Sequence, residues 1–214
     1  MIKKNWKILT ISSVVCLLPM VAGLLLWNRM AERIPLHWNM QGVVDGWGSR
    51  AFAVFGLPLL MLAFHWLGLL AMHADPKKQN HAPKFLKLMW WFIPALSVLL
   101  CACVYSAGMG KSPRVELIAP LLIGILFIVV GNYLPKCKQN YTVGIKLPWT
   151  LDSEENWNKT HRFAGWVWLI GGILILLFGF LASPWIILPV GSLMVLLPLV
   201  YSFLLYRKEK GKEK

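Results

Sequence analysis

The sequence predicts an all-α integral membrane protein: a six-transmembrane-helix bundle with both termini inside (N-in/C-in), a structured outer loop 1 and a structured inner loop 4. Three observations support this fold class. Of the 214 residues, 57% are hydrophobic and only 14% are charged, whereas soluble domains carry about 25% charged residues. Six apolar stretches have the length of roughly 20 residues that crosses a bilayer. Lysine and arginine are distributed unequally among the connections between these stretches.

The six predicted spans contain no charged residue except Glu116, at the edge of the fourth. They are Ile8–Trp27, Ala51–His73, Leu88–Met109, Val115–Leu134, Phe163–Ala182 and Trp185–Tyr206. The first begins like a secretory signal, but its apolar region is longer than the usual 7–15 residues or so, and no small-residue cleavage pattern follows. We therefore interpret it as a retained helix. Only Ser183-Pro184 separates the last two spans, which predicts a tight helical hairpin.

The spans divide the chain into two three-span halves, residues 1–110 and 111–214, which we expect to form a single membrane domain. Membrane proteins keep most lysine and arginine in their cytoplasmic segments. With the N-terminus inside, all but five of the 22 such residues lie in inner segments; the five are Arg29, Arg33, Arg50, Lys111 and Arg114. The formal charge of +13 is therefore a topology signal that also favours anionic membrane lipids. We expect no direct binding of nucleic acid and no cofactor.

The first connection, Asn28–Arg50, is expected outside the cell and mixes aromatic, glycine, proline and titratable residues, as shaped binding loops do. Pro35 favours extended chain in its surroundings, from Ile34 to Asn39. Gly42 and Asp45-Gly46 are turn signals, because glycine accepts positive φ without steric cost. The sequence thus predicts an extended segment followed by turns.

His37, Asn39 and Asp45 are candidates for a small polar site in this outer loop. Histidine nitrogen and carboxylate oxygen bind divalent metals, but His37 and Asp45 are only two ligands, and His65 in the second span would have to add a third. A second interpretation is that Asn39 and Asp45 satisfy loop amides while His37 orders a turn. A third is direct recognition of a partner, with the candidate contacts His37, Asn39, Gly42, Asp45 and Trp47.

The fourth connection, Pro135–Arg162, is expected inside the cell. Pro148-Trp149-Thr150-Leu151 predicts a change of chain direction, and Ser153 has the features of an N-cap with two glutamates, Glu154 and Glu155, in the first turn. The helix that starts there is predicted to run into the fifth span. On it Trp157, His161 and Gly165 share one face, with Thr160 beside them.

An interfacial helix anchored by Trp157 and by a snorkelling Arg162 would explain part of this pattern. It explains less well why Asn140, Gly144, Pro148 and Thr150 occur in the same stretch. Within the spans, His65 is the one ionisable residue near mid-membrane. Such a residue is a functional-site hypothesis by default, and the alternative is a neutral histidine that hydrogen-bonds between helices.

Three runs in the fourth connection and the adjoining ends of its two spans resemble the signature of the SdpI immunity-protein family of bacterial multi-pass membrane proteins. They are Asn132–Pro135, Asn140–Leu151 and Trp157–Gly165. The outer run Ile34–Asn39, with the glycines and aspartate after it, is similar to the domain of unknown function that commonly precedes this signature. Lys146 stands where the family often has arginine, and lysine lacks the bidentate geometry of arginine. The signature positions are Asn132, Pro135, Asn140, Gly144, Lys146, Pro148, Trp149, Thr150, Trp157, Thr160, His161 and Gly165.

The resemblance implies a non-enzymatic protein of the bacterial plasma membrane that protects the cell against a secreted peptide toxin. It also implies, for systems that signal, a small cytosolic transcriptional repressor held at the membrane once toxin is bound. Two alternatives remain. A metal-assisted membrane enzyme acting on an amphipathic peptide or lipid would use His37, Asp45 and His65, or His161 with Glu154 or Glu155. A transporter of amphipathic compounds would use His65 as its buried coupling group.

Overall fold

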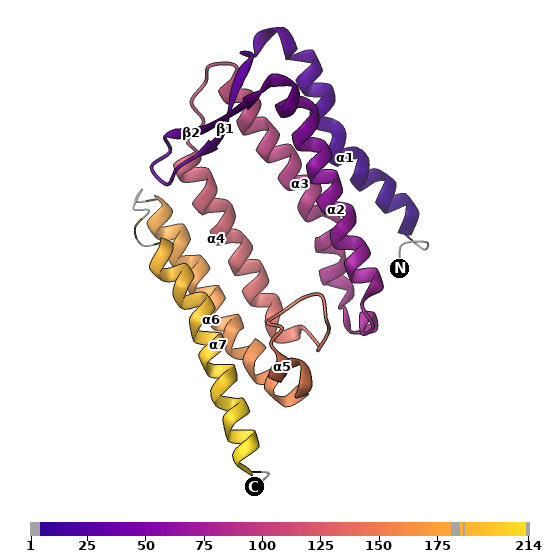
Figure 1. Ribbon diagram of the computed structural model, residues 1–214, viewed down its shortest axis with the longest axis vertical. Coiled ribbons are helices and arrows are strands. Elements are labelled where there is room, and N and C mark those ends of the chain that lie inside the picture. The colour runs from indigo at the N-terminus through magenta and orange to yellow at the C-terminus, as the bar shows by residue number, and fades with distance from the viewer. Residues whose placement is uncertain (1–4, 181–184, 186, 213–214) are drawn as a thin grey trace. The chain divides into compact units, whose positions relative to one another are not determined.

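The computed structural model describes residues 5–180, 185 and 187–212 (Figure 1). Six helices in this part of the chain are long and apolar enough to cross a membrane, which confirms the predicted class of multi-pass helical membrane protein. They are α1 (Trp6–Leu25), α2 (Leu57–Ala74), α3 (Pro83–Gly108), α4 (Val115–Tyr133), α6 (Glu154–Phe180) and α7 (Ile187–Lys212). The other elements are the strands β1 (Arg33–Trp38) and β2 (Val44–Ser49), the short helix α5 (Pro148–Asp152), and a π-helical turn over Phe52–Gly56 that leads into α2.

Most helix ends lie close to the predicted span ends, and two helices begin earlier for identifiable reasons. Pro83 starts α3, because the fixed φ of proline suits the first helical position. Ser153 starts α6, since its Oγ accepts a hydrogen bond from the Asn156 N–H at 3.1 Å. Both the predicted cap and the predicted continuation into the fifth span are thereby confirmed. The predicted Ser183-Pro184 hairpin lies outside the described residues.

The chain forms two compact units. The first comprises the chain up to Ala74 together with Pro83–Val115, and the second comprises Asp75–Ala82 together with the chain from Glu116. The connection between α2 and α3 therefore belongs to the second unit. The sequence did not single out this connection as part of a site.

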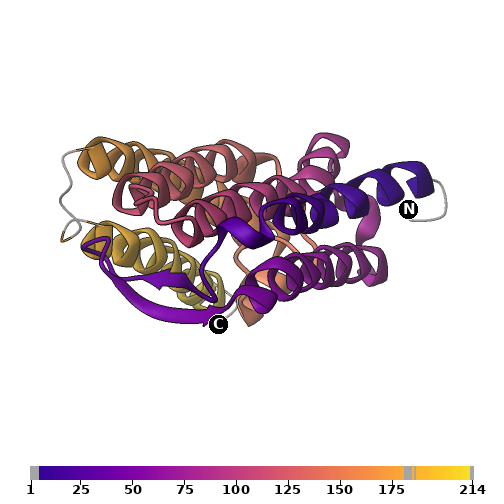
Figure 2. The same cartoon turned by 90° about the horizontal axis from the view of Figure 1, so that it is seen from above.

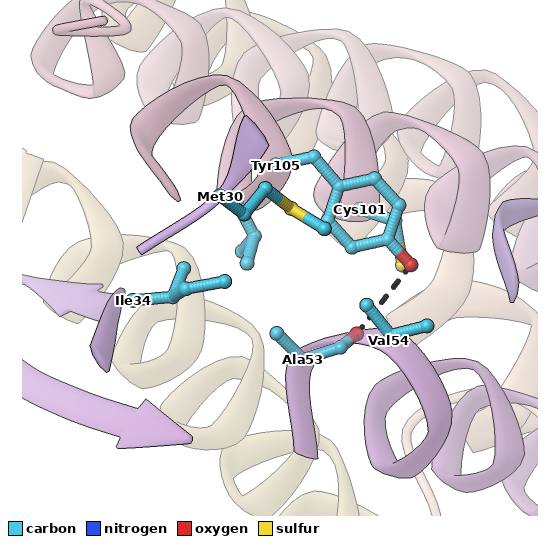
Figure 3. Packing of buried hydrophobic residues seen from close by; sticks show 7 residues of the cluster. Met30, Ile34, Ala53, Val54, Cys101 and Tyr105 are labelled. Atoms are coloured by element: carbon cyan, nitrogen blue, oxygen red, sulfur yellow. Dashed lines mark hydrogen bonds between the residues drawn. The ribbon is translucent and has the colours of Figure 1, made fainter. Parts of the chain in front are cut away.

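In the first unit α1, α2 and α3 contact one another, and the β1–β2 hairpin lies at the end where α1 finishes and α2 begins (Figures 1 and 2). A cluster of buried side chains joins the hairpin to the helices (Figure 3). Within it Tyr105 donates hydrogen bonds to the backbone oxygens of Pro19 at 3.1 Å and Ala53 at 3.5 Å. The cluster consists of Met30, Ile34, Ala53, Val54, Cys101, Val104 and Tyr105.

The hairpin confirms the extended chain predicted after Ile34, because β1 pairs with β2 in antiparallel register from Arg33↔Ser49 to Trp38↔Val44. Gly42 forms the tip with φ of +74°, as its turn signal predicts. The prediction of a turn at Asp45-Gly46 was wrong, because both residues lie in β2. Gly46 faces His37 where the register shifts, and a Cβ there would lie 2.7 Å from the His37 Cβ. The glycine permits close approach of the strands.

In the second unit α4 and α6 pack backbone against backbone through glycines. A Cβ built on Gly131 would lie 2.7 Å from the backbone nitrogen of Leu169 and 2.9 Å from the carbonyl oxygen of Gly165. A Cβ on Gly172 would lie 2.7 Å from the carbonyl oxygen of Gly124. Small residues are enriched at such contacts in membranes, because association there depends on close packing.

We predict that Gly131→Ala lowers the free energy of unfolding by about 1–3 kcal/mol, the usual cost of overpacking a close contact. The measurement is thermal unfolding in detergent. The matched control is Gly191→Ala, since Gly191 on α7 has no neighbour within 4 Å of such a Cβ. Equal effects of the two substitutions would contradict the packing role of Gly131.

Candidate functional site

The β1–β2 hairpin brings together the two titratable residues, His37 and Asp45, that the sequence singled out in the first connection. His37 Nδ1 lies 2.5 Å from Asp45 Oδ1, and the two side chains are 72% and 44% exposed. Trp47 is also exposed. An exposed pair of this kind adds little to stability, so these side chains are available for contacts outside the chain.

Asn39 has a different role in the same hairpin. Its Oδ1 accepts hydrogen bonds from the backbone N–H groups of Gln41 at 3.0 Å and Val43 at 2.9 Å. The Gly42 N–H donates to the Asn39 carbonyl at 3.0 Å. Asn39 and Gly42 therefore close the tip, while the His37–Asp45 pair lies along the strands.

His65 is buried in α2 of the first unit, with Nε2 2.9 Å from Ser12 Oγ on α1 and its ring edge-on to Trp90. The described residues contain no group of three or more histidine, cysteine, aspartate and glutamate side chains that could hold a metal ion. Among the described residues, the three candidate metal ligands therefore have separate partners. His37 pairs with Asp45, and His65 hydrogen-bonds to Ser12.

The fourth connection contains an ordered segment, Cys137–Leu147, which we call the signature loop. Asn140 is fully buried and organises its first half. Its Oδ1 accepts hydrogen bonds from the N–H groups of Thr142 at 2.9 Å and Val143 at 2.7 Å, and its Nδ2 donates to the Lys138 carbonyl at 2.9 Å. A buried amide that uses both its donor and its acceptor in this way fixes the turn.

His161 and Trp157 hold the second half of the signature loop. Their rings stack with centroids 4.0 Å apart. The Ile145 N–H donates to His161 Nε2 at 3.0 Å, so Nε2 is an acceptor and the proton lies on Nδ1, which donates to the Trp157 carbonyl at 2.8 Å. Trp157 Nε1 in turn donates to the Cys137 carbonyl at 2.7 Å. Both ring nitrogens of a neutral His161 therefore take part in hydrogen bonds within the protein.

Gly144 lies directly against this stacked pair. Its φ is +118°, a conformation that side-chain-bearing residues rarely adopt. A Cβ there would collide with His161 Nε2 and lie 3.0 Å from the Trp157 ring. Both backbone conformation and space therefore require glycine at this position.

Thr150 connects the signature loop to α5. Its Oγ1 accepts a hydrogen bond from the Leu147 N–H at 2.9 Å and lies 2.8 Å from the Ile145 carbonyl, to which it donates. Pro148 begins α5, where its missing N–H has no cost. At the other end of α5, Gln139 Nε2 donates to the carbonyls of Thr150 at 3.0 Å and Leu151 at 2.9 Å.

α5 and the start of α6 are also bound to α7. Trp149 Nε1 donates to Ser202 Oγ at 3.0 Å, and Asn156 Nδ2 donates to the Ser202 carbonyl at 3.1 Å. Thr160 donates to Asn156 Oδ1 at 3.0 Å. Trp149 also stacks on Tyr206 at 5.7 Å. The predicted turn around Trp149 is thus a short helix that packs against α7.

The remaining signature positions lie at the border of this network. Gly165 packs against Pro135, whose Cγ would be 2.6 Å from an added Cβ. Lys146 is exposed and its Nζ donates to the Thr142 carbonyl at 3.0 Å. Asn132 is exposed on α4. Glu155, one of the acids considered for acid–base chemistry with His161, pairs with Lys159.

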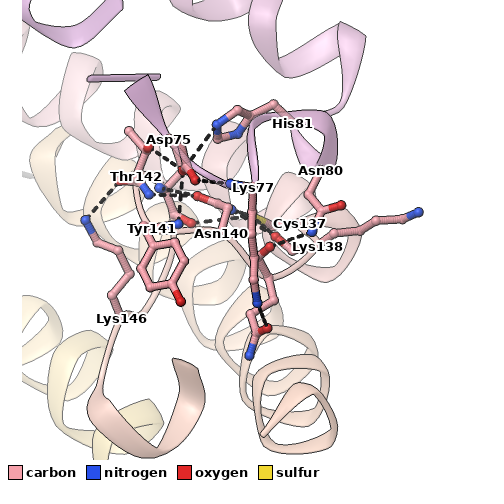
Figure 4. Close-up of polar contacts among 12 residues, drawn as sticks. Asp75, Lys77, Asn80, His81, Cys137, Lys138, Asn140, Tyr141, Thr142 and Lys146 are labelled. Atoms are coloured by element: carbon pink, nitrogen blue, oxygen red, sulfur yellow. Dashed lines mark hydrogen bonds and ion pairs between the residues drawn. The ribbon is translucent and has the colours of Figure 1, made fainter. Parts of the chain in front are cut away.

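Sequence reasoning missed Asp75, the buried residue that follows α2. Its Oδ2 accepts hydrogen bonds from Thr142 Oγ1 at 2.5 Å and the Tyr141 N–H at 3.0 Å, and its Oδ1 accepts the Lys77 N–H at 2.8 Å (Figure 4). His81 Nε2 lies 3.4 Å from Asp75 Oδ2. The usable signal was that Asp75 is the one acidic residue of a lysine-rich connection and precedes a proline, which favours a turn.

The rest of this connection also contacts the signature loop. Asn80 Nδ2 donates to the Gln139 carbonyl at 2.7 Å, and Lys77 Nζ donates to Gln139 Oε1. The Lys77 ammonium also lies 5.6 Å from the centroid of the Tyr141 ring. Asp75 is therefore the centre of a wider set of contacts between Asp75–Ala82 and the signature loop.

The electrostatics of this site follow from burial and hydrogen bonding. Burial by itself would raise the pKa of Asp75, but the hydrogen bonds from Thr142, Lys77 and Tyr141 and the proximity of His81 together lower it. Burial lowers the pKa of His81 more than Asp75 raises it. Burial raises the pKa of the Cys137 thiol to about 11, so this thiol is protonated and a poor nucleophile at neutral pH. The arrangement holds a loop in one conformation.

The fold defines a multi-pass helical membrane protein, and comparison with known proteins agrees with this class. Residues 136–202 match the SdpI/YfhL protein family, and residues 14–62 match a domain of unknown function, DUF1648. The chain is 30% identical to Immunity protein SdpI of Bacillus subtilis (strain 168) over 219 aligned positions, which cover 98% of this chain and 99% of that protein. No solved structure matches. The chain belongs to the SdpI/YfhL family and is a multi-pass protein of the cell membrane.

We predict that Gly144→Ala destabilises the protein by roughly 1–3 kcal/mol, because it combines backbone strain with a collision against His161. Thermal unfolding in detergent measures the effect. Gly110→Ala is the control, since Gly110 also has a positive φ, +78°, but no atom within 4 Å of an added Cβ. If Gly144→Ala lowers the stability no more than Gly110→Ala does, the contact with the His161 and Trp157 rings does not require glycine at position 144.

We also predict that the protein loses stability as pH falls from 7.5 to 5.5, partly through His81. Its folded pKa lies below the ordinary value of 6.5, so the unfolded chain binds a proton first. The stabilisation is complete above 6.5 and is lost as pH falls through the folded pKa, at no more than about 1.4 kcal/mol per pH unit for one proton. His81→Gln should reduce the pH dependence of the unfolding temperature. An unchanged pH profile in this variant would refute the role of His81.

Proposed function

We propose that this chain is a membrane immunity protein that protects a bacterial cell against a secreted antimicrobial peptide toxin. The observation that carries the proposal is the similarity over nearly the whole chain to Immunity protein SdpI. A role in immunity favours binding over catalysis, and the hydrogen bonds that occupy both nitrogens of His161 are consistent with that choice.

We further propose that both termini lie inside the cell, so that the β1–β2 hairpin faces outward and the signature loop faces the cytosol. The distribution of lysine and arginine supports this orientation. In it residues 1–110 carry the outer contact surface, and residues 111–214 carry the inner one. The exposed Lys136, Lys138 and Lys146 would then face anionic lipids of the inner leaflet.

The toxin contact is proposed at the hairpin, where polar and apolar side chains are exposed side by side. His37 and Asp45 form the polar part, and Met40, Val43 and Trp47 form the apolar part. Aromatic and methionine side chains are enriched at binding surfaces. An amphipathic peptide could use both parts at once, with Asn39 and Gly42 maintaining the shape of the tip.

On the cytosolic side we propose that the signature loop is the surface that a small repressor would bind once toxin occupies the hairpin. This coupling requires that the toxin bind two states of the protein with different affinities. The hydrogen bonds of the signature loop support the idea. A loop that is fixed by a few specific hydrogen bonds can exist in two states, one with these bonds formed and one with them broken.

We predict that His37→Ala and Asp45→Ala each lower the toxin concentration that cells survive by about tenfold, the effect of losing one hydrogen bond to a charged group. The test expresses the chain in Bacillus subtilis lacking Immunity protein SdpI and exposes the cells to medium from the intact strain. Membrane levels of each variant are measured alongside.

The matched control for this experiment is Glu32→Ala, because Glu32 is an exposed carboxylate just before β1. Its survival should equal that of the unaltered chain. If both His37→Ala and Asp45→Ala protect undiminished at normal membrane levels, the hairpin is not the toxin contact. If the unaltered chain gives no protection, the proposal fails for this toxin altogether.

A further inference from the structure

We propose that α2 links the outer hairpin to the signature loop, and that Asp75 is a positioning residue that holds this loop closed until α2 shifts. The inference rests on the proposed function for its purpose, which is to carry a signal from the hairpin to the inner surface. Its test does not use a toxin. Three features of the chain support it: a set of side-chain hydrogen bonds at each end of the helical segment that contains α2, and a helix irregularity between them.

The hydrogen bonds at the hairpin end are made by Arg50, which follows β2 directly. Its Nη1 donates to the carbonyls of Trp27 at 2.8 Å and Met30 at 2.9 Å, and its guanidinium lies 4.6 Å from the centroid of the Trp27 ring. Its backbone N–H donates to the Glu32 carbonyl at 2.8 Å. Since Arg50 binds residues on the chain leading into β1, a displacement of the hairpin acts on the residue that precedes the helix.

The irregularity is the π-helical turn Phe52–Gly56 between Arg50 and α2. Such turns contain one residue more than an α-helical turn and occur frequently at functional sites. Conversion of the turn to α-helix would move the rest of the helix by about one residue, or about 1.5 Å along its axis. In the proposed mechanism this conversion supplies the second of two discrete registers of α2, the kind of two-state element that coupling between sites requires.

The hydrogen bonds at the other end are accepted by Asp75, the residue immediately after Ala74, where α2 ends. Its hydrogen bonds to Thr142, Tyr141 and Lys77 are 2.5–3.0 Å long, and hydrogen bonds of this type weaken steeply beyond about 3.2 Å. A displacement of the Asp75 carboxylate by about 1.5 Å relative to the signature loop would therefore break them. The carboxylate is fully buried, so the loss is not immediately compensated by water.

Cys137 is a natural probe of the signature loop. It is only 5% exposed, and its Sγ donates to the Val143 carbonyl at 3.6 Å. The other cysteines of the chain lie in α1 and α3. The rate at which N-ethylmaleimide modifies Cys137 in membranes containing the full chain, measured by mass spectrometry of its peptide, therefore reports opening of the loop.

We expect Asp75→Ala to raise this rate at least about tenfold, because it removes the acceptor of several hydrogen bonds. Thr142→Val, which removes only one donor, should raise it less and serves if Asp75→Ala does not accumulate in the membrane. Asp152→Asn is the matched control, since Asp152 is an exposed carboxylate on α5, and it should leave the rate unchanged. Unchanged rates in both Asp75→Ala and Thr142→Val would overturn the role of Asp75.

The link through α2 is tested by Arg50→Lys, which retains the charge but loses the planar group that binds two carbonyls. If α2 transmits the change, modification of Cys137 becomes at least about threefold faster, while Arg33→Lys, at an exposed position in β1, has no effect. A raised rate in Asp75→Ala together with an unchanged rate in Arg50→Lys overturns the link. These rates are measured without toxin, so failure of the toxin-survival experiment is a separate result.

Discussion

A non-helical segment next to a membrane span must find hydrogen-bond partners for its backbone, and the second unit depends on how the signature loop meets this requirement. Its amides donate to side chains that come from three separate parts of the chain. Asn140 accepts two of them within the loop, Asp75 accepts that of Tyr141, and His161 accepts that of Ile145. Each unpaired buried amide would cost about 1–3 kcal/mol, so these acceptors together fix one loop conformation.

This requirement explains why the conspicuous residues of the loop are of such different types. Asparagine supplies a donor and an acceptor in a tight turn, threonine caps a short helix, and a neutral histidine joins one amide to one carbonyl. Gly144 is needed because any side chain would occupy the space of the His161 and Trp157 rings. In the first unit Arg50 performs a comparable task, since it satisfies two carbonyls on the chain that leads into the β1–β2 hairpin. Both polar segments are thus held in defined shapes.

Local signals made a large part of the fold predictable. Apolar length located the six spans, because a bilayer admits only segments that satisfy their own backbone. Pro35 indicated the extended chain of β1, and Ser153 indicated the start of α6, since both effects operate within a few residues. Helical spacing placed Trp157 and His161 on one face, where they stack. The turn predicted at Asp45-Gly46 failed because a glycine that permits strands to approach each other looks the same in sequence as one that permits a turn.

The sequence by itself therefore determined the membrane class, the spans, the Ser153 cap of α6 and the family signature, all of which depend on neighbours along the chain. Only the tertiary structure decided that Asp75 belongs with Tyr141 and Thr142, more than sixty residues away. The physical reason is that a carboxylate in a polar connection is ordinarily solvated. Its importance arises from burial and from donors brought to it by folding, and neither is visible in the residues that flank it.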